Sequence, residues 1–114
     1  MDVPHDTQEK IVRLQMLEQN IQSFASQRQQ FQMHVAEIEH ALKELKTTTE
    51  RPFRVLGQLM VAADKDDLTK ELTSQKEVSD IRIKSLEKQE QQLKEKAEAL
   101  QQEVLSALQK KGVK

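Results

Sequence analysis

A chain of 114 residues with no Trp, no Tyr and only 3 Phe cannot fill a thick globular core, because few large apolar side chains are available to bury. Charged residues make up 32% of the sequence, but the formal net charge is only -1, which argues against a polyanionic partner such as nucleic acid or an anionic membrane surface. The absence of cysteine excludes disulfides, a thiol nucleophile and thiolate metal sites. We therefore expect an elongated protein that buries its apolar residues along a narrow seam.

The N-terminal residues and the apolar runs predict neither secretion nor membrane insertion. Residues 1–10 lack the basic start and the apolar run of a signal peptide. The longest wholly apolar stretch, Leu59 to Ala63, is far too short to cross a bilayer. These features favour a soluble, cytoplasmic protein without a membrane partner.

The first expected element is a helix over about residues 6–47, capped by Asp6 or Thr7. Within it, ten positions follow alternating steps of three and four residues, and nine of them are apolar, which is typical of a coiled coil. These seam positions are Leu14, Leu17, Ile21, Phe24, Arg28, Phe31, Val35, Ile38, Leu42 and Leu45. Arg28 is the exception, and we expect its stem to pack while its guanidinium extends into solvent.

A β-hairpin is predicted after this helix, over residues 52–63. Three consecutive threonines and a proline end the helix, because β-branched residues and the position before a proline disfavour helical backbone. Two short apolar runs then follow, 53–56 and 59–63, joined by Gly57 and Gln58. Gly at the first central position suits a type II′ turn, which requires a positive φ there.

The turn also predicts the register of the two strands. Leu56 is placed opposite Leu59, and Arg54 opposite Val61. The other face carries Phe53, Val55, Met60 and Ala62. An isolated hairpin is marginally stable in water, and this one has apolar residues on both faces and two unpaired edges. We therefore expect hairpins from several subunits to pair and stack into a β body.

The last expected element is a second helix over about residues 65–110, preceded and opened by acidic residues. Its distal part has a regular seam of Ile83, Leu86, Glu90, Leu93, Ala97, Leu100, Val104 and Ala107. Val78 and Ile81 do not fit this frame, which predicts a local stutter between Leu72 and Ile81. The fold class expected is mainly α: a long antiparallel two-helix coiled coil, or helical hairpin, with a short β-hairpin inserted between the helices, forming one domain over 1–114.

Apolar residues outside these seams gather near both chain ends. They are Ile11, Val12, Met16, Leu105, Leu108 and Val113. They are either ordinary exposed apolar residues, which are common on any surface, or an adaptable surface that binds exposed hydrophobic segments of other proteins. Composition alone does not separate the two interpretations.

The central residues and the second helix resemble the β-class prefoldin subunits, in their archaeal form more than in the eukaryotic one. The resemblance rests on PFRVLGQLMV over 52–61, KDDLTKEL over 65–72 and SLEKQEQQLKEK over 85–96. In that family a hairpin of the form aromatic-basic-x-apolar-Gly-x-apolar-apolar-Val lies between two coiled-coil helices. Phe53 stands here where many relatives carry Tyr.

The resemblance implies an ATP-independent holdase without a cofactor, built as a hexamer of two α-class and four β-class subunits. It implies that unfolded or nascent proteins are held at the coiled-coil tips and passed to a group II chaperonin in the cytosol. Assembly is then expected to fall to Phe53, Val55, Leu56, Leu59, Met60 and Val61. Client binding is expected at Ile11, Val12, Met16, Val104, Leu105 and Leu108.

Catalysis and metal binding are not expected. The one catalytic-looking spacing is Glu37 with His40, whereas di-metal helical bundles need two such motifs and further carboxylates. With only 2 Gly in the chain, no glycine-rich loop is available to cradle phosphate. The alternative functions are a coiled-coil scaffold or adaptor without client-holding activity, and a nucleic-acid-binding helical arm. The lack of basic clusters and stacking aromatics disfavours the second alternative.

Overall fold

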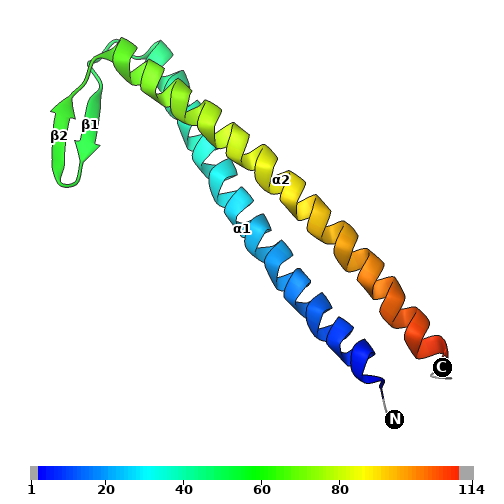
Figure 1. The fold of residues 1–114 in the computed structure, drawn as a ribbon. Helices are drawn as coiled ribbons and strands as arrows, with labels where there is room; N and C mark the ends of the chain where they lie inside the picture. The colour runs from blue at the N-terminus through cyan, green and yellow to red at the C-terminus, as the bar shows by residue number, and fades with distance from the viewer. Residues whose placement is uncertain (1–2, 111–114) are drawn as a thin grey trace. The chain divides into compact units, whose positions relative to one another are not determined.

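The computed structural model describes residues 3–110 and contains two long helices and one β-hairpin (Figure 1). The elements are α1 (His5–Thr47), β1 (Phe53–Leu56), β2 (Leu59–Ala62) and α2 (Lys65–Lys110). This confirms the predicted fold class. The described residues form two units, which are treated separately: the terminal unit, 3–28 with 85–110, and the hairpin unit, 29–84.

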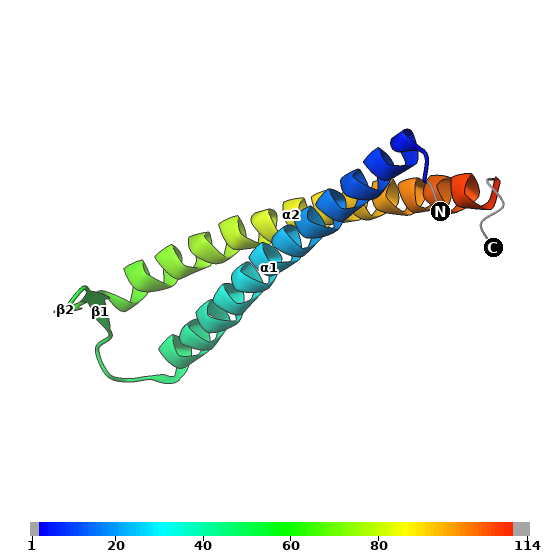
Figure 2. The same ribbon diagram turned by 90° about the horizontal axis from the view of Figure 1, so that it is seen from below.

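The two helices run antiparallel within each unit, as contacts between distant parts of the sequence show. In the terminal unit, the Lys10 ammonium lies 3.8 Å from a carboxylate oxygen of Glu103. In the hairpin unit, the Lys76 ammonium lies 3.3 Å from a carboxylate oxygen of Glu39. A loop over residues 48–52 carries the chain from the end of α1 to β1 (Figure 2).

The N-terminal caps of the two helices differ in how well the sequence predicted them. The expected cap of α1 at Asp6 or Thr7 is wrong, because the helix begins at His5 and the Pro4 carbonyl accepts a hydrogen bond from the Gln8 amide at 3.0 Å. Proline lacks an N–H but keeps its carbonyl, so it can start the helical bond series. Thr7 is instead almost fully buried.

The cap of α2 follows the acidic pattern seen in the sequence. The Asp64 carbonyl accepts a hydrogen bond from the Leu68 amide at 2.9 Å. The Asp64 side chain accepts a second one from the Asp66 amide at 3.4 Å. The first bond opens the helical series, and the second satisfies an amide that has no partner inside the helix.

The seam of the terminal unit follows the predicted spacing. Its buried residues on α2 are Leu86, Glu90, Leu100 and Val104. Half-buried residues of α1 line the same seam: Leu14, Leu17, Ile21 and Phe24. A coiled coil of two helices buries each side chain only in part, which explains why so few large apolar residues suffice.

The seam of the hairpin unit departs from the sequence prediction on α2. Val35, Ile38 and Leu45 are buried on α1, as the heptads predict. On α2, however, Ser79 is buried at 4% exposure, while Val78 and Ile81 are exposed. The predicted stutter is wrong: a three-and-four spacing continues through Leu72, Lys76, Ser79, Ile83 and Leu86, none of which is exposed, and Asp80 next to Ser79 is half-buried as well. An unbroken heptad avoids local unwinding of the helix, and the small serine is tolerated in the seam.

The β-hairpin confirms both the predicted turn and the predicted register. Phe53 pairs with Ala62, Arg54 with Val61, Val55 with Met60, and Leu56 with Leu59. Gly57 has a φ of 61°, and no residue other than glycine has a positive φ among those described. A positive φ at the first central position followed by a negative φ at Gln58 is the type II′ pattern.

Candidate functional site

The hairpin presents an apolar surface that the other described residues leave largely exposed. All six residues expected to serve assembly are exposed, with exposed fractions between 46% for Val61 and 69% for Met60. Within the described residues the sheet has two strands, so each strand has one edge whose backbone groups lack a strand partner there. Apolar faces and open edges together are the features through which sheets associate with other chains.

A salt bridge links the hairpin to α2. The Arg54 guanidinium donates from Nη1 to Oε1 of Glu71 at 2.8 Å, and from Nη2 to Oε2 of the same carboxylate. These hydrogen bonds lower the pKa of Glu71 below its ordinary value and raise the pKa of Arg54. Sequence reasoning placed Arg54 opposite Val61 but missed Glu71. The sequence feature that could have indicated this salt bridge is an arginine in an otherwise apolar strand, followed by a glutamate in the early turns of the next helix.

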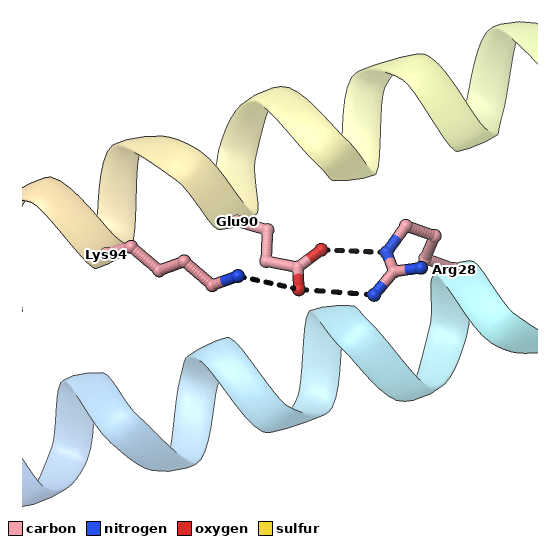
Figure 3. Close-up of polar contacts among 3 residues, drawn as sticks. All are labelled: Arg28, Glu90 and Lys94. Carbon is pink, nitrogen blue, oxygen red and sulfur yellow. Dashed lines mark hydrogen bonds and ion pairs between the residues drawn. The ribbon is translucent and has the colours of Figure 1, made fainter.

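A second salt bridge lies inside the seam of the terminal unit (Figure 3). Arg28 of α1 donates from Nε to Oε2 of Glu90 at 2.8 Å and from Nη2 to Oε1 at 3.4 Å. Lys94 Nζ lies 3.6 Å from Glu90 Oε1. The predicted extension of the Arg28 guanidinium into solvent is therefore wrong. Glu90 is buried, and an unpaired carboxylate there is costly, so the arginine turns inward to pair with it.

The same pairing sets the ionisation of Glu90. The hydrogen bond from Arg28 lowers the pKa of Glu90 below its ordinary value, and the charges of Arg28 and Lys94 act in the same direction. Burial opposes this shift but does not reverse it. The carboxylate is thus held ionised in the seam, surrounded by two cations.

The apolar residues near the chain ends differ in exposure. Val12 and Met16, one turn apart on α1, are exposed at 55% and 59%, and Leu105 of α2 is exposed at 47%. Ile11 and Leu108 are half-buried. Val104 is buried in the seam, so its side chain is not part of an exposed surface, and Val113 lies outside the described residues.

An open hollow of about 640 Å³ lies beside Val12 and Met16 of α1 in the terminal unit. It is lined by His5, Gln8, Glu9, Val12, Arg13 and Met16. The unbranched thioether of Met16 adapts to differently shaped apolar partners, and the charged neighbours form a polar rim. We use the name tip surface for the exposed residues Val12, Met16 and Leu105 of the terminal unit, of which the first two line this hollow.

Two of the histidines lie near a glutamate one turn further along α1. His5 Nε2 lies 3.1 Å from a Glu9 carboxylate oxygen, and His40 Nε2 lies 4.0 Å from one of Glu44. Over residues 3–110 there is no group of three or more side chains of the types that hold a metal ion. Nor does a helix in that range have the length and apolarity needed to span a bilayer.

Comparisons with known proteins point to one family. A family model described as "Prefoldin subunit" matches residues 8–111. The chain is 37% identical over 109 residues to the prefoldin subunit beta of Archaeoglobus fulgidus, covering 94% of each chain. It is 34% identical over 103 residues to that of Methanospirillum hungatei, covering 89% of this chain and 86% of that one.

Solved structures agree with these sequence similarities. The structure is similar to the crystal structure of the prefoldin beta subunit from Thermococcus strain KS-1, with a TM-score of 0.85 and 29% identity. That match covers 94% of this chain and 96% of the other. The prefoldin beta2 subunit of the same strain has the same fold, with a TM-score of 0.72 at 23% identity and coverage of 78% and 97%.

Proposed function

The chain belongs to the prefoldin family as a β-class subunit, and from this premise we propose that it holds non-native polypeptides without ATP and delivers them to a group II chaperonin. Prefoldin is a family of chaperones and not of enzymes. The observation that carries the proposal is the combination of an exposed apolar hairpin with exposed apolar residues near both chain ends.

The hairpin supports a role in assembly. Six apolar side chains on two faces, with two open strand edges, would lead to non-specific association if they stayed uncovered. We propose that they are covered by the hairpins of α-class and other β-class subunits in a hexamer. The residues involved are Phe53, Val55, Leu56, Leu59, Met60 and Val61.

The tip surface supports a role in client binding. Val12, Met16 and Leu105 are exposed although the seam of the terminal unit is complete without them. Each contact with an unfolded segment is small and weak, but several subunits that act on one client gain avidity. We propose that Ile11 and Leu108, which are half-buried, form the margin of the same surface and that the holding takes place in the cytoplasm.

A coiled-coil scaffold or adaptor is the alternative function. In that case the seams and the hairpin serve only to recruit partners, and the tip surface has no role. The two functions differ in one outcome: removal of the apolar tip residues abolishes the holding of clients in the chaperone and leaves the scaffold unaffected.

The decisive experiment mixes the protein with an α-class subunit and measures the mass of the complex by light scattering. The purified complex is then added to a denatured test protein without nucleotide, and turbidity is followed during refolding. We expect a hexamer that slows aggregation. A complex of the right mass that leaves aggregation unchanged would favour the scaffold, and a stable monomer in the mixture would refute assembly through the hairpin.

A further inference from the structure

The hairpin is tied to its own α2 by a single pair of side chains. Among residues 3–110, Arg54 is the only side chain of either strand that forms a hydrogen bond or ion pair with a helix. The hairpin is otherwise joined to the helices by the chain itself: the loop over 48–52 leads from α1, and the short connection over 63–64 leads into α2. In Figure 1 the hairpin hangs from the connection that leads into the start of α2. Glu71 is the seventh residue of α2.

This pair contributes orientation more than stability. The side chains of Arg54 and Glu71 are exposed at 38% and 37%, so water screens their attraction. Their geometry is nevertheless restrictive, because a planar guanidinium and a planar carboxylate joined by two parallel hydrogen bonds fix both separation and direction. A pair of this kind limits the pivoting of the hairpin on its two connections.

The contact also makes the two hairpin faces inequivalent. Side chains alternate along a strand, so Arg54 shares its face with Leu56, Leu59 and Val61. The Arg54 face is the one linked to α2. The opposite face carries Phe53, Val55, Met60 and Ala62, for which the described part of the chain shows no hydrogen bond or ion pair to a helix.

We infer that Arg54 and Glu71 form an orienting clamp that fixes which hairpin face is presented to neighbouring subunits and in which direction. This inference rests on the proposed function, because it assigns a task in assembly to residues outside the apolar set. A hairpin held in its assembled direction loses less conformational entropy on binding than one that pivots freely. Glu71 also supplies a counter-charge to Arg54 when neighbouring chains exclude water from that face.

The clamp can be tested directly by a distance measurement within the chain. The protein has no cysteine, so Gln58→Cys in the turn and Ser74→Cys on α2 give two unique spin-label sites in the hairpin unit. Labelled protein is diluted into unlabelled protein so that only distances within one chain are recorded by double electron–electron resonance. We expect a narrow distance distribution in the parent and one about twofold broader in Glu71→Gln.

Matched variants separate the clamp from a general loss of charge. Glu39→Gln removes an ion pair between the helices of the same unit and should leave the distribution narrow. The charge-reversed double variant Arg54→Glu with Glu71→Arg should restore the narrow distribution. Arg54→Lys should not, because an ammonium keeps the charge but lacks the fork. Equal widths in the parent and Glu71→Gln would overturn the inference.

Assembly provides the second readout. With an α-class partner, Glu71→Gln should need about tenfold higher concentration than the parent to form the complex, while its helical circular dichroism stays unchanged. The charge-reversed variant should recover the parental concentration. If the parent itself fails to assemble, the proposed function is wrong. The widths of the distance distributions then still show whether Arg54 and Glu71 hold the hairpin in one direction. If the parent and Glu71→Gln assemble at equal concentration, the clamp has no role in assembly.

Discussion

Arg28 and Glu90 are the charged residues of the two predicted seams, one on each helix, and they pair with each other at 2.8 Å between Nε and Oε2. The Glu90 side chain is exposed at only 7%, and that of Arg28 at 23%. The pair therefore forms a polar layer in the apolar seam of the terminal unit. A polar layer favours the one register that brings its members together, because any other register separates the buried Glu90 carboxylate from the Arg28 guanidinium of the opposite helix.

Replacing one member of this pair should destabilise the protein more than replacing both. Glu90→Leu or Arg28→Leu removes the partner across the seam from the charge that remains, and we expect the thermal midpoint to fall by about 5 °C. The double variant Arg28→Leu with Glu90→Leu should return to within about 2 °C of the parent, since leucine packs well at seam positions. Thermal unfolding followed by circular dichroism measures all three.

The exposed ion pair of the same unit is the control for this comparison. Glu103, whose side chain is 59% exposed, pairs with Lys10 at 3.8 Å, and Glu103→Leu should change the midpoint little. Single seam variants as stable as the parent would contradict a structural role for the Arg28–Glu90 pair.

Acid should remove the contribution of Glu90 to stability. The hydrogen bond from Arg28 lowers the pKa of Glu90 in the folded protein, so the unfolded chain takes up this proton at a higher pH than the folded one. The stabilisation is complete above the ordinary glutamate pKa of about 4.3 and is lost as the pH falls through the lower folded pKa.

The measurement for this pH effect is the thermal midpoint from about pH 6 to about pH 3. The difference between the parent and Glu90→Gln should be largest near neutral pH and should shrink in acid. Glu103→Gln should follow the parental profile in parallel. A difference between the parent and Glu90→Gln that grows in acid would contradict the direction of the shift.

Opposite charges on one hairpin face should prevent assembly without unfolding the hairpin. Val55 and Met60 are direct partners in the strand register, so Val55→Glu with Met60→Lys places an attractive pair across the strands while making the face polar. We expect the double variant to stay monomeric by sedimentation in the presence of an α-class subunit. Met33→Lys, at a position 66% exposed on α1, should assemble normally. An unchanged complex mass in the double variant would exclude this face from the interface.

The tip surface should be needed for holding clients but not for assembly. Met16→Gln and Met33→Gln are the same substitution on the same helix, at exposed fractions of 59% and 66%. We expect Met16→Gln combined with Val12→Gln to reduce suppression of aggregation about tenfold, because several weakened contacts act on one client. Met33→Gln should retain full activity. Equal loss in both variants would point to a general effect of exposed apolar area.

The hairpin turn should depend on glycine at position 57 through its backbone. A Cβ added at Gly57 meets nothing within 4 Å, so the cost of Gly57→Ala comes from its φ of 61° and not from a clash. We expect a penalty of about 1–2 kcal/mol on the hairpin, seen as faster amide exchange in β1 and β2. Gln58→Ala, next to it at a negative φ, should exchange at the parental rate.

Regular spacing of apolar residues makes the helices and the hairpin predictable from the sequence. A two-residue turn led by Gly57 fixes every cross-strand partner by counting, and the observed pairs from Phe53–Ala62 to Leu56–Leu59 match it. The heptads of α1 likewise place Val35, Ile38 and Leu45 in the seam. Both patterns are local, so they can be recognised in the sequence without information on contacts between distant residues.

The sequence by itself therefore determined two helices, a hairpin and a heptad frame, because turn chemistry and helical periodicity act over a few residues. Only the tertiary structure decided that Arg28 pairs with Glu90, that Arg54 pairs with Glu71, and that Ser79 is buried while Val78 and Ile81 are exposed. Each of these depends on which residue of one element faces which residue of another. A long side chain such as arginine can reach either solvent or a partner, so its position depends on whether a partner lies nearby in the folded protein.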